Sequence, residues 1–419
     1  MIVTAHARLV AISRSLLAQL ISLLIFAPAH WVVQHRHRSL PTLPPFCHPC
    51  PPHRGYARTQ ALTVPAPSCR HGPSGVAKVT CRLRVRGSAT WMDEQDLPGG
   101  PITDVERLTG GTQNILLKFR RGGSDYVLRR PPIHKRAKSD ETMRREARVL
   151  AALRDSPVPH PSLIAACGDV DVLGCAFYLM EPIDGFNPAS GLPAPHRDDP
   201  AMRHQMGLSM VDAAAMSQVD VDAAGIGDLG RREGYLERQS ARWQSQLESY
   251  RELDGYAGSE LPSVDAVSEW LDRNRPSTWQ PGLVDGDFHL ANVMFSPSGP
   301  ELAAVVDWEM ATIGDPLLDL GWMLTTWPVD ERAAAILTIE PSSGFPTRDE
   351  LVARYQEVCG RDLTALPWFE VLAAYKLGIV LEGTHARACA GQADKATGEF
   401  LHAAAVSLLE HAGNLIAQN

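Results

Sequence analysis

Two neighbouring stretches place acidic and amide side chains at fixed distances inside otherwise apolar sequence. The first covers residues 283–295 (LVDGDFHLANVMF), where Asp287 stands five residues before Asn292. The second contains the apolar run 302–306, which ends at Asp307. An Asp-x4-Asn pair alone is common by chance. Such a pair is much rarer when it lies between apolar segments and when a strand-ending Asp follows 15 residues later.

This spacing is the one that phosphoryl transfer needs. One carboxylate, Asp287, would accept or orient the proton of an attacking hydroxyl. The side chains of Asn292 and Asp307 would hold the Mg²⁺ that neutralises charge on the phosphates of ATP. The pattern therefore predicts Asp287 as the catalytic residue and Asn292 and Asp307 as metal ligands.

The two stretches resemble the catalytic and metal loops of the aminoglycoside phosphotransferase (APH) family, whose fold is similar to that of the protein kinases. The segment GDPLLDLGWML at 314–324 also fits that family. The phrases LTGGTQN, YVLRRPP and GYLERQSARW, which begin at Leu108, Tyr126 and Gly234, are similar to the branch associated with acyl-CoA dehydrogenases. The resemblance extends roughly from Leu97 to the C-terminus.

The resemblance implies an α+β, bilobal, protein-kinase-like fold with ATP in the cleft between the lobes. We expect a small antiparallel-sheet lobe that binds the nucleotide over residues 92–182. A larger helical lobe over residues 183–419 would carry the catalytic and metal loops.

Residues 1–91 differ in composition from the rest of the chain. They hold eleven Lys and Arg and no acid, whereas the remainder holds 29 bases and 48 acids. The apolar run 16–29 resembles a signal peptide but is short for a membrane span, which needs about 20 residues. We expect residues 1–91 to be disordered: either an upstream extension before a true start at Met92, or a targeting segment. Because the apolar run is short, we expect no stable membrane insertion. We expect a cytoplasmic location, because ATP is an intracellular substrate.

The nucleotide lobe should contain a phosphate-binding turn and a cationic strand. Gly110, Gly111 and Thr112 would let backbone N–H groups approach phosphates, although an ordinary hairpin turn is the alternative. The resemblance places Arg129 where the kinase pattern has a Lys, with Arg130 expected to face solvent. Glu146 would pair with this cation, unless it is an exposed helix Glu.

Other positions follow from the resemblance. The backbone around Glu181 would face the adenine at the hinge. Asp285 replaces the His of the family's usual His-Gly-Asp, and its closeness to Asp287 is expected to raise one pKa. Asp315 and Asp319 would cap a helix and bond the catalytic loop rather than react. His289 could contact the transferring phosphate or solvent.

We therefore expect an enzyme that transfers the γ-phosphoryl group of Mg-ATP to a hydroxyl of a small molecule, with hydroxyacyl-CoAs among the candidate acceptors. The alternatives are a nucleotide-binding pseudokinase that acts as a scaffold or sensor and, more weakly, a protein kinase. The acidic main part argues against nucleic-acid binding. Residues 183–281 hold sixteen acids and nine bases, which suits a cationic acceptor or simply a solvated surface. The sequence does not set the oligomeric state.

The eight cysteines do not indicate a disulfide framework in a chain of 419 residues. Cys167, Cys175, Cys359 and Cys389 lie in apolar or helical surroundings and are expected to be buried thiols. The segment 47–50 (CHPC) has metal or redox spacing but no second such pair.

Overall fold

The computed structural model describes residues 87–108, 114–135, 137–214, 219–328, 337 and 339–419. The strands are β1 (Thr103–Leu108), β2 (Ile115–Arg121), β3 (Ser124–Arg130), β4 (Leu163–Cys167), β5 (Phe177–Met180), β6 (Gly282–Val284), β7 (Val293–Phe295), β8 (Leu302–Val305) and β9 (Thr312–Gly314). The α-helices are α3 (Ser139–Leu153), α4 (Val170–Leu173), α5 (Ala194–Asp198), α6 (Pro200–Ala213), α7 (Gln239–Ser249), α8 (Val264–Arg273), α9 (Leu317–Thr325), α10 (Arg348–Cys359), α11 (Leu366–Cys389) and α12 (Lys395–Gln418). Short 3-10 turns are η1 (Pro188–Ser190), η3 (Tyr250–Glu252), η4 (Leu290–Asn292) and η5 (Trp308–Met310).

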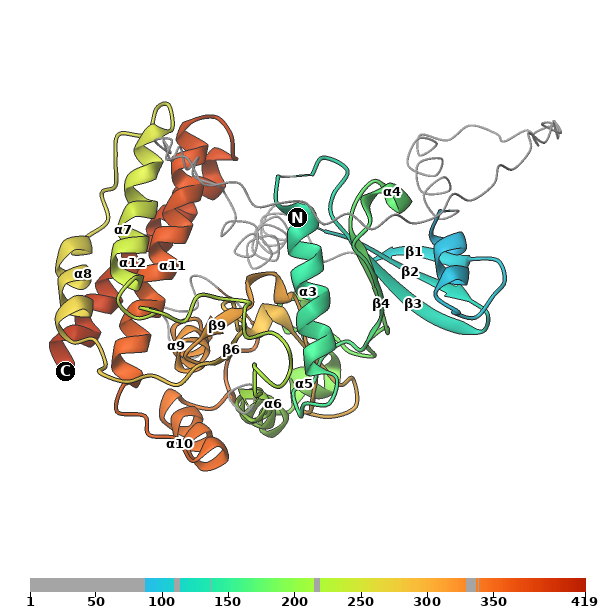
Figure 1. Cartoon of the computed structure of the whole chain (residues 1–419). Coiled ribbons are helices and arrows are strands. Elements are labelled where there is room, and N and C mark those ends of the chain that lie inside the picture. Colours follow the sequence, from blue (N-terminus) through green and yellow to red (C-terminus); the bar gives the residue numbers. More distant parts are fainter. Residues whose placement is uncertain (1–86, 109–113, 136, 215–218, 329–336, 338) are drawn as a thin grey trace, which may run out of the picture.

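The N-terminal lobe is a five-stranded sheet in the order β1-β2-β3-β5-β4, with every neighbouring pair antiparallel. The central strand β3 is covered on both faces. Successive side chains of a strand point in opposite directions, so neighbouring residues of β3 enter different clusters. Val127 joins the core that includes α3, whereas Tyr126 and Leu128 join a second cluster on the opposite face. Helix α3 lies beside this sheet, on the side that faces the rest of the molecule (Figure 1).

The second face of the sheet is covered by a helical segment at residues 87–94. Trp91 packs edge-on against Phe177 with ring centroids 4.8 Å apart, and Met92 is fully buried. The expected boundary at Met92 falls inside this segment. Trp91 and Met92 therefore pack as part of the N-terminal lobe, and the position of its boundary stays a prediction.

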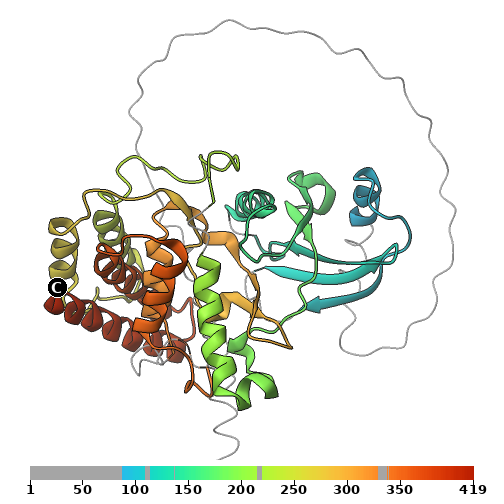
Figure 2. The ribbon, with the colours of Figure 1, turned by 90° about the horizontal axis from the view of Figure 1, so that it is seen from below.

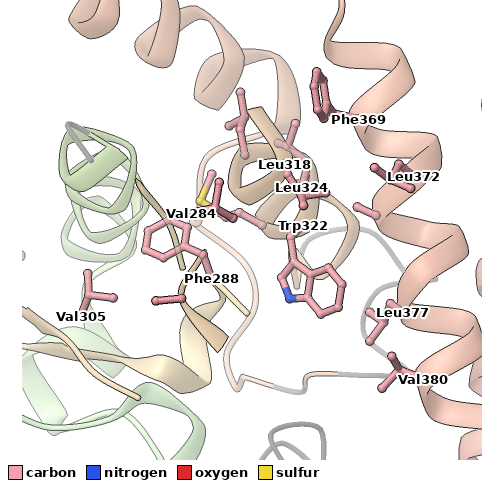
Figure 3. Close-up of a cluster of buried hydrophobic side chains, with 14 of the residues drawn as sticks. Val284, Phe288, Val305, Leu318, Trp322, Leu324, Phe369, Leu372, Leu377 and Val380 are labelled. Atoms are coloured by element: carbon pink, nitrogen blue, oxygen red, sulfur yellow. The ribbon is translucent and has the colours of Figure 1, made fainter. Parts of the chain in front are cut away.

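The C-terminal lobe is built mainly of helices, and α11 is its central element. Twenty-four residues long, α11 packs against α9, α12, α7 and α8. Gly321 of α9 permits a close approach, because a Cβ atom there would lie 2.8 Å from the carbonyl oxygen of Phe369. Figure 3 shows Trp322 of α9 between Phe288, which lies in the segment 283–295, and Leu377 of α11. Figures 1 and 2 show the sheet lobe and the helical lobe side by side, with β6 and β9 between them.

The fold expectation is confirmed: an antiparallel sheet with one main helix precedes a helical region. Two details of the sequence interpretation are wrong. Arg130 does not face solvent but is only 4% exposed, because both faces of β3 are covered. Cys389 is exposed near the end of α11 and Cys359 is only partly buried, whereas Cys167 and Cys175 are buried as expected. Within the described ranges, none of the helices combines the length and the apolar character that crossing a membrane requires.

Shortened chains test the boundary of the N-terminal lobe. A chain that begins at residue 87 should keep the unfolding transition of the full chain. A chain that begins at Met92 lacks Trp91 and places a charged terminus on a buried residue, so its unfolding free energy should fall by about 3–5 kcal/mol. Thermal and urea unfolding measure the difference. Trp91→Ala in the full chain should reproduce the loss, and Ile133→Ala, at a 55% exposed side chain, should not. Equal stability of the two shortened chains would contradict the assignment.

Candidate active site

Two short antiparallel strand pairs bring the two sequence stretches together. Strand β6 pairs with β9, and β7 pairs with β8. Val293 is the register partner of Val305, and the amide of Val306 donates to the carbonyl of Asn292 at 2.9 Å. Asn292 directly precedes β7, and Asp307 follows the end of β8. The two residues are therefore neighbours in space although 15 positions separate them.

The carboxylate of Asp287 is buried, with 1% of the residue exposed. The side-chain amide of Asn292 donates to Oδ2 of Asp287 at 2.9 Å and to its carbonyl oxygen at 3.1 Å. Nε2 of His289 lies 3.1 Å from Oδ1 of Asp287, and Nδ1 of His289 accepts from the amide of Ala291. His289 thus contacts Asp287 itself, a contact that the sequence did not indicate.

The loop before Asp287 is held by carboxylates, as expected for Asp319. The amides of Asp285 and Gly286 donate to the two carboxylate oxygens of Asp319 at 2.7 and 2.9 Å. Asp285 in turn accepts from the amide of Asp287 at 3.0 Å. Burial raises the pKa of the Asp285 carboxyl well above its usual range, and the neighbouring Asp319 and Asp287 act in the same direction. Asp315 accepts from the amide of Leu317 at the start of α9, which confirms its capping role.

A buried lysine that the sequence interpretation missed completes this loop. Nζ of Lys376 on α11 donates to the carbonyl of Gly286 at 2.9 Å and lies 4.3 Å from the ring centre of Trp322. Gly286 has φ +87°, and a Cβ atom there would lie 3.1 Å from the carbonyl oxygen of Met310. The signal was available, because a single Lys stands inside the apolar helix sequence VLAAYKLGIVL, where charged residues are rare.

Arg129 links the sheet lobe to the metal-loop stretch. Its guanidinium donates to both carboxylate oxygens of Glu146 on α3, at 2.8 and 3.2 Å. Its Nη2 atom also donates to Oδ1 of Asp307 at 2.5 Å. The expected pairing of Arg129 with Glu146 is confirmed, and Glu146 is fully buried. Burial raises the pKa of Glu146 to about 7, and the charge of Arg129 opposes that shift.

A third carboxylate, Glu309, stands beside this pair. Oxygen atoms of Glu146, Asp307 and Glu309 all lie within 4.8 Å of one another. Burial raises the pKa of Glu309 well above its usual range, and the charges of Asp307 and Glu146 add to that shift. Together with the amide of Asn292 these are oxygen donors, the ligand type that Mg²⁺ prefers. The donor set at Asn292 and Asp307 therefore fits the ion that the sequence predicts.

Four further residues are predicted to contact the nucleotide. Gly110, Gly111 and Thr112 are outside the described residues. Glu181 directly follows β5, its side chain is exposed, and its amide donates to the carbonyl of Ser162 at 3.0 Å. Its position between the sheet and the helical lobe agrees with the expected hinge, and its contact with adenine stays a prediction.

A pocket opens beside the catalytic loop, and Gly286, Glu309 and Lys376 form part of its wall. Among the described residues, this wall holds six cationic side chains and two acidic ones, Glu141 and Glu309. The cationic residues are Lys138, Arg145, Arg231, Arg238, Arg242 and Lys376. The acidic excess of residues 183–281 does not reach the pocket, since the charged residues from that range that line it are all arginines.

The phosphotransferase enzyme family, APH, matches residues 104–353, a span that contains Arg129, Glu146, Asp287, Asn292 and Asp307 but ends before Lys376. The chain belongs to this family. The sequence is 30% identical over 336 residues to acyl-CoA dehydrogenase family member 11 of Rattus norvegicus, covering 76% of this chain and 41% of that protein. It is 29% identical over 306 residues to the protein of the same name from Gallus gallus, covering 71% and 38%. The APH-family chain thus spans about two fifths of the length of these relatives.

A solved structure agrees with this assignment. A crystal structure from Ralstonia eutropha JMP134, assigned to the aminoglycoside phosphotransferases, superposes with a TM-score of 0.66 at 28% identity. The match covers 78% of this chain and 98% of that one. The resemblance to the family, predicted from the sequence, is therefore confirmed.

The pH dependence of stability tests the burial of Lys376. Burial lowers the pKa of its ammonium group to about 8. The usual value is about 10.4, so between these values the unfolded chain binds more protons than the folded one, and stability rises with pH. The unfolding free energy of wild type relative to Lys376→Met should therefore be flat below pH 8. From about pH 8 to 10 it should rise by up to about 1.4 kcal/mol per pH unit.

Urea unfolding at several pH values measures this difference. Lys395→Met is a matched control, because that side chain is 85% exposed and should give a flat difference. A flat profile for Lys376→Met as well would mean that Lys376 keeps an ordinary lysine pKa in the folded protein.

Proposed function

We propose that this protein is a small-molecule kinase that transfers the γ-phosphoryl group of ATP to a hydroxyl of an anionic acceptor. The observation that carries the proposal is the convergence of Asp287, Asn292 and Asp307 with the Arg129–Glu146 pair. These groups come from both lobes and together supply a proton acceptor, oxygen ligands and a permanent cation. Membership of the phosphotransferase family supports the same reaction class.

Asp287 acts as the general base in this mechanism. Its carboxylate takes the proton of the acceptor hydroxyl while the hydroxyl oxygen forms a bond to the γ-phosphorus, and the bond from that phosphorus to the ADP oxygen breaks. The side-chain amide of Asn292, 2.9 Å from Oδ2, fixes the orientation of the carboxylate. Asp319 and Lys376 hold the peptide at Gly286, so the base is positioned before the substrate arrives.

Arg129 and the oxygen ligands serve the nucleotide. When bound at Asn292 and Asp307, Mg²⁺ neutralises negative charge on the phosphates. Arg129 is bonded to Asp307 in this structure. In the complex it would exchange that contact for phosphate oxygens while Glu146 keeps its orientation. Gly110, Gly111 and Thr112 would cover the phosphates, and the backbone at Glu181 would face the adenine.

The charge of the pocket selects the acceptor class. Six cations against two acids disfavour a polycationic acceptor such as an aminoglycoside and favour one that carries phosphate or carboxylate groups. A hydroxyacyl-CoA has both a hydroxyl and several phosphates, and the named relatives are acyl-CoA dehydrogenase family members. We therefore propose hydroxyacyl-CoAs as the first acceptors to examine. We also propose a cytoplasmic location, because ATP is an intracellular substrate.

Substitutions at the two aspartates separate base from metal ligand. Asp287→Asn keeps the size of the side chain but removes the proton acceptor, so turnover should fall by about 10²- to 10⁴-fold with little change in ATP affinity. Asp307→Asn should weaken Mg²⁺-dependent ATP binding as well as turnover. Steady-state ATP turnover with an accepted substrate and nucleotide titration with and without Mg²⁺ measure both effects.

Asp349→Asn, at a side chain that is 93% exposed, is the control and should change neither quantity. Turnover that survives Asp287→Asn would overturn the assignment of the base. A wild type that binds Mg-ATP yet phosphorylates nothing in a broad acceptor panel would favour the nucleotide-binding scaffold instead.

The acceptor class is tested at Arg238, which lines the pocket and donates to the carbonyl of Arg231 at 2.7 Å. Loss of a charge-assisted contact is worth about 1.5–3 kcal/mol, so Arg238→Ala should raise KM for an anionic acceptor about 10- to 100-fold. The KM for ATP should stay unchanged.

Arg251→Ala removes an exposed arginine outside this pocket and should leave both KM values unchanged. Raising the ionic strength should also raise the acceptor KM of wild type. Better turnover of cationic than of anionic acceptors would contradict the proposed class without affecting the assignment of Asp287.

A further inference from the structure

Away from the cleft, helices α11 and α12 bring three metal-binding side chains together. Glu382 and His385 stand three positions apart on α11 and therefore share one face of that helix. His402 faces them from α12, which packs along α11. One donor atom from each residue lies within 4.8 Å of the other two.

The side chains in this cluster are held in a defined arrangement. The buried carboxylate of Glu382 accepts from the hydroxyl of Tyr256 and from Nδ1 of His402, both at 2.7 Å. The ring of His385 lies against that of His402, with centroids 4.5 Å apart. The Nδ1 atom of His385 is buried and has no hydrogen-bond partner in the described part of the chain.

A buried nitrogen without a hydrogen-bond partner lowers the stability of the folded protein unless a ligand bonds to it. Two imidazoles and one carboxylate form a donor set that Zn²⁺ accepts, with a fourth position left for water or another ligand. A Glu-x-x-His sequence on one helix is a known way to direct two ligands at one metal ion. Tyr256 would supply the second hydrogen bond that orients the Glu382 carboxylate.

We propose that Glu382, His385 and His402 bind one divalent transition-metal ion, of which Zn²⁺ fits the donor set best. The ion takes the place of the hydrogen that Nδ1 of His402 donates to Glu382, and the neutral imidazole then carries its proton on Nε2. Bound there, the ion ties α12 to α11. Because α11 also carries Lys376, about 9 Å from Glu382 along the helix axis, the site would stabilise the helix that supports the catalytic loop.

The test is Zn²⁺ binding to the full chain after treatment with a chelator. Calorimetric titration and metal analysis should show one tightly bound Zn²⁺ more in wild type than in His385→Ala or in His402→Ala. In each variant the zinc affinity of that site should fall by at least about 10- to 100-fold, which is the effect of losing a residue that only bonds to a metal ligand. Zn²⁺ should also raise the melting temperature of wild type but not of the variants.

Matched variants separate this site from other zinc-binding groups. His204→Ala removes a histidine that contacts a single carboxylate, Glu350, and should behave as wild type. The segment 47–50 is present in every variant, so its contribution cancels in the comparison. Equal zinc binding by wild type and His385→Ala overturns the proposal. The thiol of Cys389 lies 3.7 Å from His385. The proposal is therefore also overturned if Cys389→Ser loses zinc binding while His385→Ala retains it. His385→Ala decides the question even where His402→Ala fails to fold.

Discussion

One buried guanidinium connects the two parts of the chain on which the chemistry depends. Arg129 comes from the central strand of the sheet, Glu146 from the helix beside it and Asp307 from the far stretch that follows β8. Two ionised carboxylates this close in a low-dielectric site repel each other, and the cation between them offsets that repulsion. The permanent charge of arginine meets that requirement at any physiological pH, and its forked geometry lets one side chain bind both acids.

The catalytic loop depends on a second set of buried polar contacts, all of which come from the helical lobe. Asp319 accepts from the amides of Asp285 and Gly286, and Lys376 donates to the carbonyl of Gly286, so both backbone polar groups of Gly286 are held. The positive φ of Gly286 permits that geometry, because a glycine adopts it without steric cost. The loop that presents Asp287 is thus held by α9 and α11 rather than by its own sequence.

The pocket beside Gly286 and Lys376 shows how far local charge can depart from overall charge. The chain carries a formal net charge of −8, and residues 183–281 are acidic as a whole. Yet the side chains from that range that line the pocket and carry charge are Arg231, Arg238 and Arg242. The net charge of a chain affects its solubility, whereas the binding of a ligand depends on the few charged side chains that face one pocket.

By itself the sequence determined the family and the fold class, and it predicted Asp287, Asn292, Asp307, Arg129 and Glu146 as site residues, of which the structure confirms the pairing of Arg129 with Glu146. It could do so because an acid-amide-acid spacing between apolar strands leaves few alternative structures. The tertiary structure alone decided which distant groups surround these residues and which of their neighbours are buried. Lys376 reaches the loop from 90 positions away, and Arg130 is buried because a helix around Trp91 covers the other face of its sheet. Periodicity and spacing report only the neighbours of a residue along one element. Contacts between distant elements follow from how the helices and strands pack, which no single segment encodes.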